Sequence, residues 1–281
     1  EIEIPSPTGQ GTPRRIPEVL DCWFESGSMP YAQGHYPFEN ADYFDANFPA
    51  DFISEGLDQT RGWFYTLTVL AAALFDKPAF KNCIVSGMLL AEDGRKMSKR
   101  LKNYPEPSEM IHAYGADALR LYLLNSPAIK AEEMRLTESG IKQSLRDVII
   151  PLWNAYSFFV TYAKIDGWTP QDVESTHRLD RWILSELQTL VHVINVEMEA
   201  YRLYRTVPAM VLFVEKLTNW YIRRSRRRFW KSEDDEDKNS AYSTLYRVLV
   251  TFAKSLAPVL PFVTESIYQN LVRRWDTEVP Q

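Results

Sequence analysis

The residues best suited to chemistry in this sequence form a short basic run, Lys-Met-Ser-Lys-Arg at residues 96–100. The run follows the turn signal Asp93-Gly94 within residues 90–104, where apolar side chains are scarce, so we expect an exposed loop. Two ammonium groups and a hydroxyl on such a loop can bind a polyphosphate and neutralise the charge that grows as a phosphate leaves. Taken alone, a lysine-rich loop is more often ordinary solvated surface.

A second polar group follows an expected strand. The sequence Glu-Gly-Leu-Asp-Gln-Thr-Arg-Gly-Trp-Phe at residues 55–64 comes directly after a strand-like run at residues 51–54. In an open α/β sheet, ligands bind outside the carboxyl ends of the strands, and a carboxylate there can accept hydrogen bonds from ribose hydroxyls. The alternative is that Asp58 only caps the helix that follows.

A cluster of basic residues lies further along the chain, directly after Trp220 and Tyr221. It consists of Arg223, Arg224, Arg226, Arg227, Arg228 and Lys231. Such a cluster offers phosphate contacts to RNA, and arginine also stacks on exposed bases. The alternative is an internal set of ion pairs with the acidic residues 233–237, or packing of part of the cluster, since Arg223, Arg227 and Trp220 share one helix side.

These motifs together resemble the class I aminoacyl-tRNA synthetases. The run at 96–100 is similar to the family's Lys-Met-Ser-Lys-Ser loop and departs from it only at Arg100. Gly-Ala-Asp-Ala-Leu-Arg at 115–120 is similar to the stretch that leads from the catalytic fold into the helical domain. The resemblance implies catalytic roles for Lys96, Ser98 and Lys99. It implies an ATP or adenylate site, with Mg²⁺ beside the phosphates, made of Glu55, Gly56, Asp58, Met88, Leu89, Lys96, Met97, Ser98 and Lys99.

Within the family, the chain resembles the isoleucyl, valyl and leucyl group. The run Asp-Cys-Trp-Phe-Glu-Ser-Gly at residues 21–27 looks like the isoleucyl version of its region, whereas valyl enzymes usually continue as Trp-Phe-Ser-Ser. The resemblance implies that Gln59 lies near the amino-acid carboxylate and that Trp23 and Trp63 line the side-chain pocket. Two indole faces suit a branched aliphatic substrate. They separate isoleucine from valine by only about 1–3 kcal/mol, a limit for which this family is the standard worked example, so editing elsewhere is implied.

The implied activity is ATP-dependent ligation of isoleucine to tRNA(Ile) by an enzyme of the eukaryotic cytoplasmic type. Arg223, Arg224, Arg227 and Arg228 are the predicted tRNA contacts. The family's other ATP motif, of the His-Ile-Gly-His type, occurs nowhere in the sequence. The chain also begins without a Met or an apolar signal stretch, so we expect an excised piece whose amino-terminal catalytic half and editing domain lie elsewhere. A valine-specific relative and a non-catalytic tRNA-binding or structural module stay open as alternatives.

Composition narrows the class of protein. A chain of 281 residues with 45% hydrophobic and 25% charged residues is typical of a soluble globular protein of about two domains. The net charge of −5 argues against binding nucleic acid by overall attraction, although a local basic face permits it. The two cysteines and four histidines show no disulfide, metal or catalytic-triad spacing, so we assign no metal ligands. No apolar run is long enough to cross a membrane.

The elements that must position these residues divide the chain into three parts. Residues 1–18, rich in Pro and Gly, are expected to be a linker, and residues 19–125 the C-terminal half of a Rossmann-type α/β domain. In the latter we expect strands at 51–54 and 83–90 around a helix at 58–74. A short helix with Ser108 as N-cap should then end at a left-handed Gly115, and the next helix should run to Asn125.

Residues 126–281 should form an all-α antiparallel bundle that binds the anticodon. One apolar stripe consists of Leu179, Ile183, Leu187, Leu190 and Ile194. Similar stripes cover 138–163, 206–231, 240–256 and 262–273, and Pro151 should kink the first of these helices.

Overall fold

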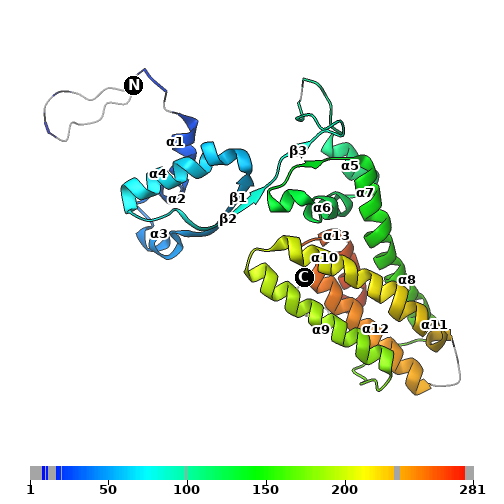
Figure 1. Ribbon diagram of the computed structural model, residues 1–281. Coiled ribbons are helices and arrows are strands. Elements are labelled where there is room, and N and C mark those ends of the chain that lie inside the picture. Colours follow the sequence, from blue (N-terminus) through cyan, green and yellow to red (C-terminus); the bar gives the residue numbers. More distant parts are fainter. Residues whose placement is uncertain are drawn as a thin grey trace. The chain divides into compact units, whose positions relative to one another are not determined.

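The computed structural model describes residues 8–9, 11, 17–19, 21–98, 100–230 and 235–275 (Figure 1). The chain divides into two compact units, Glu1–Val85 and Ser86–Gln281, which we call unit 1 and unit 2. Most of the expected linker at 1–18 lies outside the described residues.

Unit 1 is a strand–helix–strand unit preceded by three short helices. Its elements are α1 (Cys22–Gly27), α2 (Met29–Ala32), α3 (Ala41–Asn47), β1 (Ala50–Gly56), a 3-10 helix (Leu57–Arg61), α4 (Trp63–Phe75) and β2 (Phe80–Ser86). The N–H of Ala50 donates to the carbonyl of Ala79 at 3.0 Å, so the two strands of this sheet begin side by side. Paired strands that begin at the same edge run in parallel, and α4 joins them, so the predicted βαβ unit is confirmed.

The crossover helix begins later than predicted. We expected a helix from Asp58 to Leu74, but residues Leu57–Arg61 form a 3-10 helix and α4 begins only at Trp63. Gly62 separates the two, as the C-cap of the 3-10 helix and the N-cap of α4.

Unit 2 begins with a small α/β part. Its elements are β3 (Leu89–Leu90), α5 (Pro107–Tyr114), α6 (Ala116–Leu124), a 3-10 helix (Pro127–Lys130) and β4 (Met134–Arg135). β3 pairs in parallel with β4, with Leu89 opposite Met134 and Leu90 opposite Arg135.

The single strand predicted at 83–90 is interrupted. β2 ends at Ser86, and β3 begins only at Leu89, after Gly87 and Met88. The N–H of Gly87 donates to the carbonyl of Ala128 at 2.6 Å. Gly87 also lies against the backbone of Glu132, where a Cβ would be only 1.8 Å from the carbonyl oxygen. The close approach therefore requires glycine and interrupts the strand.

The two helices that follow the lysine loop differ from prediction in their caps. Ser108 is not the N-cap of α5, because Glu106 occupies that position and Pro107 is the first helical residue. Proline is favoured there, since its missing N–H would have no partner in a first turn. Gly115 ends α5 with φ +85° but ψ 151°, so it is not left-handed helical. α6 ends at Leu124 with Asn125 as C-cap, as predicted.

The motif at 115–120 joins α6 to the last helices of the bundle. The buried carboxylate of Asp117 accepts a hydrogen bond from the N–H of Val263 at 2.7 Å. The guanidinium of Arg120 donates to the carbonyl of Pro258 at 2.8 Å. These contacts fix the start of unit 2 to residues near its end.

The rest of unit 2 is helical, as predicted. Its elements are α7 (Glu138–Ser144), a π-helical turn (Leu145–Ile149), α8 (Ile150–Ile165), α9 (Arg178–Glu199), α10 (Leu203–Glu215), a π-helical segment (Lys216–Ile222), α11 (Arg223–Trp230), α12 (Asp235–Leu256), α13 (Pro261–Tyr268) and a π-helical turn (Gln269–Arg273). α9 packs on both α10 and α12, and α12 also packs on α11 and α13.

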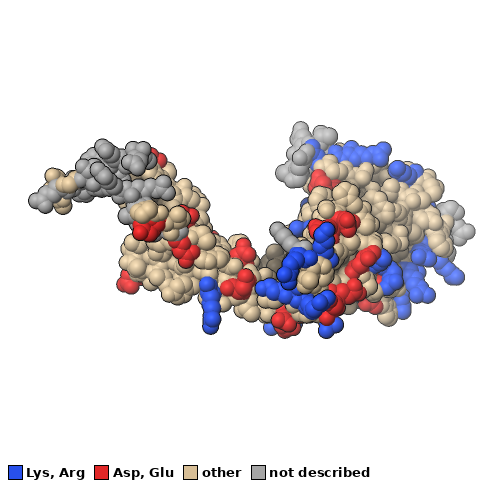
Figure 2. Space-filling model, turned by 90° about the horizontal axis from the view of Figure 1, so that it is seen from above, with Lys and Arg blue, Asp and Glu red and all other residues tan. Residues whose placement is uncertain are grey.

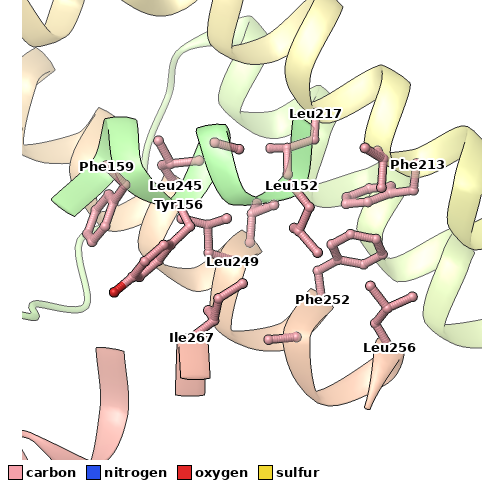
Figure 3. Packing of buried hydrophobic residues seen from close by; sticks show 14 of the residues in the cluster. Leu152, Tyr156, Phe159, Phe213, Leu217, Leu245, Leu249, Phe252, Leu256 and Ile267 are labelled. Carbon is pink, nitrogen blue, oxygen red and sulfur yellow. The ribbon is translucent and has the colours of Figure 1, made fainter. Parts of the chain in front are cut away.

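One apolar core fills this bundle. Figure 3 shows side chains of α8, α10, α12 and α13 interdigitating, among them Leu152, Phe213, Phe252 and Ile267. The predicted α9 stripe is confirmed: three of its members are buried in this core, and Leu179 and Ile194 pack against it half-buried. The predicted fold class, an α/β part followed by an all-α bundle, is therefore confirmed.

We expected a kink at Pro151, and the structure has an irregular turn just before this residue. Pro151 is the second residue of α8, and the widened π-helical turn Leu145–Ile149 precedes it. A proline ring clashes with the carbonyl four residues before it, here that of Asp147, and the wider turn relieves that clash. The predicted domain boundary after residue 125 stays a prediction.

Candidate active-site residues and a candidate RNA interface

The three predicted amino-acid-binding residues of unit 1 come together around Gly62. The side-chain oxygen of Gln59 accepts a hydrogen bond from the N–H of Trp63 at 3.1 Å. The indole of Trp23 lies so near that a Cβ at Gly62 would be 3.2 Å from its Cη2 atom and 2.9 Å from Oε1 of Gln59. A side chain at position 62 would therefore push the Trp23 indole away from the Gln59 amide, and these are two of the predicted amino-acid-binding groups.

The orientation of Trp63 is fixed from its far end. Its indole N–H donates to the carbonyl of Ser26 at 3.0 Å, which links the start of α4 to α1. Trp23 is 38% exposed and Trp63 is half-buried, so an indole surface is open to solvent beside an amide group. Such a surface can bind an aliphatic side chain through its rings and a polar head through the amide.

The predicted ribose-binding residues lie at the carboxyl end of β1. Asp58 folds back toward Gly56, where a Cβ would lie 2.6 Å from the carboxylate oxygen Oδ1. Neither the 3-10 helix nor α4 has a side-chain N-cap hydrogen bond, so the alternative that Asp58 only caps a helix is not supported. The side chains of Glu55 and Asp58 are exposed and lie where ligands of open α/β sheets bind.

The lysine loop belongs to unit 2 and continues from β3. Leu90 forms an antiparallel bridge with Lys96, and the N–H of Ala91 donates to the carbonyl of Arg95 at 2.9 Å. Lys96 is exposed, and Met97 and Ser98 are half-buried, whereas Lys99 lies outside the described residues. The predicted adenylate residues Met88 and Leu89 come just before this loop, at the start of β3 and within it.

The turn before the lysines contains an exposed ion pair. Asp93 and Arg95 lie side by side, with Nε of the guanidinium 2.7 Å from a carboxylate oxygen. Hydrogen bonds from the Arg95 side chain and backbone hold the pKa of Asp93 below its ordinary value. Both residues are solvated, so the pair shapes the turn without offering a group for acid or base catalysis.

Arg228 differs from the other arginines of its cluster because only 10% of its side chain is exposed and it takes part in an ion-pair network. Its Nη1 lies 2.6 Å from Oδ1 and its Nη2 2.9 Å from Oδ2 of Asp180, and its Nε contacts Asp237 at 2.9 Å. Asp180 is fully buried and also accepts from the hydroxyls of Tyr221 at 2.8 Å and Ser175 at 2.5 Å. This is the internal ion pairing that we considered as the alternative, and we leave Arg228 out of the proposed RNA contacts.

The sequence did not reveal Asp180 as the main partner. The predicted acidic partners were residues 233–237, of which 233 and 234 lie outside the described residues and Asp237 is confirmed. Burial alone would raise the pKa of Asp180, but hydrogen bonds from Arg228 and Ser175 outweigh it and hold that pKa below its ordinary value. Asp180 precedes Ile183 and Leu187 at helical spacing, and a charge within a buried stripe is a signal that could have identified it.

The other arginines of the cluster face solvent. Arg223, Arg224, Arg226 and Arg227 are all exposed. Arg224, rather than Arg223 or Arg227, stacks on Trp220, with its guanidinium carbon 4.3 Å from the ring centroid. On the face shown in Figure 2, Lys and Arg side chains gather over unit 2, whereas unit 1 shows mostly acidic ones.

A groove of about 650 Å³ lies beside these arginines, between α8, α10 and the π-helical segment 216–222. Arg223 and Arg226 line it together with the amides of Asn154 and Asn219 and the carboxylates of Asp147 and Glu215. Guanidinium groups bind phosphates, and amides can hydrogen-bond base edges. The two arginines and two amides are groups that RNA interfaces use, whereas the two carboxylates in the same groove would repel phosphates.

Two family models match the chain. The model described as tRNA synthetases class I (I, L, M and V) matches residues 4–135, and the model described as anticodon-binding domain of tRNA ligase matches residues 180–279. The chain belongs to the class I aminoacyl-tRNA synthetases. The first match contains the Gly62 cluster and the lysine loop, and the second contains the exposed arginines.

Curated relatives of this synthetase chain are isoleucine–tRNA ligases. That of Treponema denticola is 57% identical over 286 residues, covering 96% of this chain and 26% of the relative. That of Protochlamydia amoebophila is 60% identical over 260 residues, covering 92% of this chain and 25% of the relative. The chain thus spans about a quarter of the length of these relatives.

Solved structures agree on the synthetase fold. The ternary complex of Agrobacterium radiobacter LeuRS with tRNA and LeuAMS superposes with a TM-score of 0.72 at 18% identity, covering 96% of this chain and 33% of that one. Mycobacterium tuberculosis methionyl-tRNA synthetase with methionyl-adenylate gives a TM-score of 0.70 at 22% identity, covering 85% of this chain and 47% of that one.

Neither a metal-ligand cluster nor a membrane span occurs in the described part of the chain. The described residues contain no group of three or more His, Cys, Asp or Glu side chains able to hold a metal ion. None of the described helices is long and apolar enough to cross a membrane.

Proposed function

We propose that this chain is part of a cytoplasmic isoleucine–tRNA ligase, which activates isoleucine with ATP and transfers it to tRNA(Ile). The observation that carries the proposal is the 57–60% identity to isoleucine–tRNA ligases over at least 92% of the chain. These relatives favour isoleucine over the valyl alternative. The remaining catalytic groups, including the second ATP motif and the editing domain, would belong to the rest of the full-length protein.

In unit 1, Trp23 and Trp63 would contact the aliphatic side chain of isoleucine, and Gln59 its polar head. The geometry around Gly62 supports these roles because the hydrogen bonds of Gln59 and Trp63 position the groups without a ligand. Preformed contacts of this kind reduce the entropy lost on binding. Glu55 and Asp58 would accept hydrogen bonds from the ribose hydroxyls of ATP, and Gly56 would let the nucleotide approach the backbone.

In unit 2, Met88 and Leu89 would contact the adenine, with Met97 beside them in the loop. The ammonium groups of Lys96 and Lys99 and the hydroxyl of Ser98 would stabilise the charge that develops as pyrophosphate leaves. Mg²⁺ fits this scheme as an ion carried by the ATP phosphates, because Mg²⁺ in such enzymes uses few protein ligands and several phosphate oxygens. When bound it would neutralise phosphate charge. The exposed Arg223, Arg224 and Arg227 would contact the tRNA backbone.

The test is ATP–pyrophosphate exchange by the full-length protein with isoleucine, valine and leucine supplied separately. We expect kcat/KM to be highest for isoleucine and about 10–200-fold lower for valine, the range that one methylene allows. A preference for valine or leucine would overturn the proposed substrate. Absence of exchange with all three amino acids would leave only a tRNA-binding role.

A further inference from the structure

A single side chain holds the two ends of the Lys-Met-Ser segment together. The side-chain oxygen of Asn103 accepts a hydrogen bond from the N–H of Ser98 at 2.9 Å. Its amide nitrogen donates to the carbonyl of Lys96 at 3.2 Å. Asn103 thus pairs with backbone groups on either side of Met97, as a neighbouring strand would.

Ser98 is held on its other side as well. Its carbonyl accepts hydrogen bonds from the N–H groups of Leu101 at 3.1 Å and Lys102 at 2.9 Å. Lys102 has φ +46°, so the chain turns back sharply just before Asn103. The amide and the carbonyl of Ser98 both have partners, and within the described part of the chain the Asn103 side chain supplies the partner of the amide.

The loop at residues 91–103 buries few apolar side chains. Among the described residues from 91 to 103, Ala91 alone is buried. The base of the loop is attached to β3 by the Leu90–Lys96 bridge, but beyond Lys96 the order depends on hydrogen bonds. A loop of this kind loses its arrangement when its few hydrogen bonds are removed, because no packed core replaces them.

We propose that Asn103 is a positioning residue for phosphoryl-group chemistry, acting through Lys96 and Ser98. By fixing the backbone from Lys96 to Ser98, it orders the ammonium and hydroxyl groups before pyrophosphate departs. Groups that are preorganised in this way stabilise a transition state without reorganising during the reaction. This inference rests on the proposed function of the loop, and it adds a residue outside the five-residue motif.

The test uses the full-length protein and isoleucine-dependent ATP–pyrophosphate exchange, with kcat expressed per active site from the burst of adenylate formed. Asn103→Ala removes both hydrogen bonds, and Asn103→Asp keeps the acceptor for Ser98 but loses the donor to Lys96. We expect kcat to fall about 10-fold or more for Asn103→Ala and less for Asn103→Asp, while KM for isoleucine changes less than about two-fold. Asn270→Ala, on the surface far along the chain, is the matched control and should leave both constants unchanged.

A second measurement separates order in the loop from loss of folded protein. Hydrogen exchange of the Ser98 amide should be faster in Asn103→Ala than in wild type, with the far-UV circular dichroism melting curve unchanged. Unaltered kcat per active site in Asn103→Ala would overturn the inference while leaving the proposed function intact. Failure of the wild-type protein to exchange pyrophosphate would instead overturn the proposed function, and Ser98 exchange equal in wild type and Asn103→Ala would refute the hydrogen-bond role by itself.

Discussion

Unit 1 and unit 2 differ in how completely each covers its own apolar surface. The core of unit 1 is a small cluster around Leu67, and large apolar side chains on its elements, such as Phe52, Tyr65 and Leu74, are at least half exposed. Unit 2 has a large core that extends from α6 to the last π-helical turn, and a small second cluster of Met110, Ala118 and Ile141. Two strands and one crossover helix leave a sheet face and a helix face open, whereas a helical bundle closes around its own core.

The two units also differ in net charge. Residues 1–85 contain 12 Asp and Glu against 5 Lys and Arg, whereas residues 86–281 contain 25 against 27. The overall charge of −5 therefore hides an acidic unit and a nearly balanced one with a basic face. The difference teaches that the residues proposed to bind substrate lie in the unit with the smaller core, whereas the exposed arginines lie on a bundle that encloses its own core.

The largest expected effect comes from separating the units. Residues 86–281 expressed alone should unfold cooperatively in urea, because their core is complete within the unit. Residues 1–85 alone should show no cooperative transition, since they bury too little apolar surface to offset the chain entropy. Circular dichroism and amide exchange measure both. A cooperative transition in residues 1–85 would break the comparison.

The next largest effect should come from the buried charge of unit 2. Asp180→Ala leaves the Arg228 guanidinium without its main partner and should lower the free energy of unfolding by about 3–5 kcal/mol. Urea unfolding of residues 86–281 measures the change. Asp93→Ala, which removes a fully solvated ion pair, is the control and should change the midpoint little. A small effect of Asp180→Ala would mean that Asp237 alone holds Arg228.

The third prediction compares a catalytic role for Lys99 of unit 2 with a substrate-binding role for Gln59 of unit 1. In the full-length protein, Lys99→Ala should lower kcat for isoleucine activation by about 100-fold or more, roughly 3 kcal/mol, with KM for isoleucine little changed. Gln59→Ala in unit 1 should instead raise that KM. Arg100→Ala, outside the lysine pair, should matter much less. If Lys99→Ala kept its kcat and only bound ATP more weakly, the loop would be a ground-state contact.

The carboxylate of Asp180 should also make the stability of the fold depend on acid pH. The folded pKa of Asp180 lies below its ordinary value, and an unfolded Asp titrates near about 3.9. The stabilisation is therefore present above about pH 4 and is lost as pH falls through the lower folded pKa. Asp180→Asn should make the free energy of unfolding vary less between about pH 5 and pH 3. An unchanged slope in urea titrations would show that other carboxylates control acid unfolding.

The smallest effect should be on RNA affinity. Arg223→Ala combined with Arg227→Ala should weaken tRNA binding, and the slope of log affinity against log salt should fall by about 1 for each arginine that had bound a phosphate. Stability should not change, because both side chains are exposed. Lys77→Ala, an exposed lysine of unit 1, is the matched control. Unchanged affinity together with lower stability would indicate internal ion pairing for these arginines too.

Sequence patterns anticipated the elements whose signal is local. The α9 stripe and the strand at 51–54 follow from the spacing of their own side chains, and both were found. Boundaries fixed by distant contacts were missed. Gly87 interrupts a strand because of the Glu132 backbone, and the 3-10 helix Leu57–Arg61 takes the place of the first predicted turn of α4.

The same distinction applies to the candidate sites. The motifs pointed to Trp23, Gln59 and Trp63, and the structure brought them together at one glycine. Arg228 could not be separated from its exposed neighbours by sequence, because its partner Asp180 lies 48 positions earlier. Asn103 was missed because a side-chain contact with the backbone leaves no pattern of residue types.

The attachment of α6 by Asp117 and Arg120 sets an order of events during synthesis. Their partners lie about 140 positions later in the chain, at Pro258 and Val263. A nascent chain therefore reaches α6 long before the ribosome has made the residues that complete its hydrogen bonds. Until α13 emerges, the buried carboxylate of Asp117 has neither of its two amide donors, Phe262 and Val263. The start of α13 is thus required for α6 to finish folding.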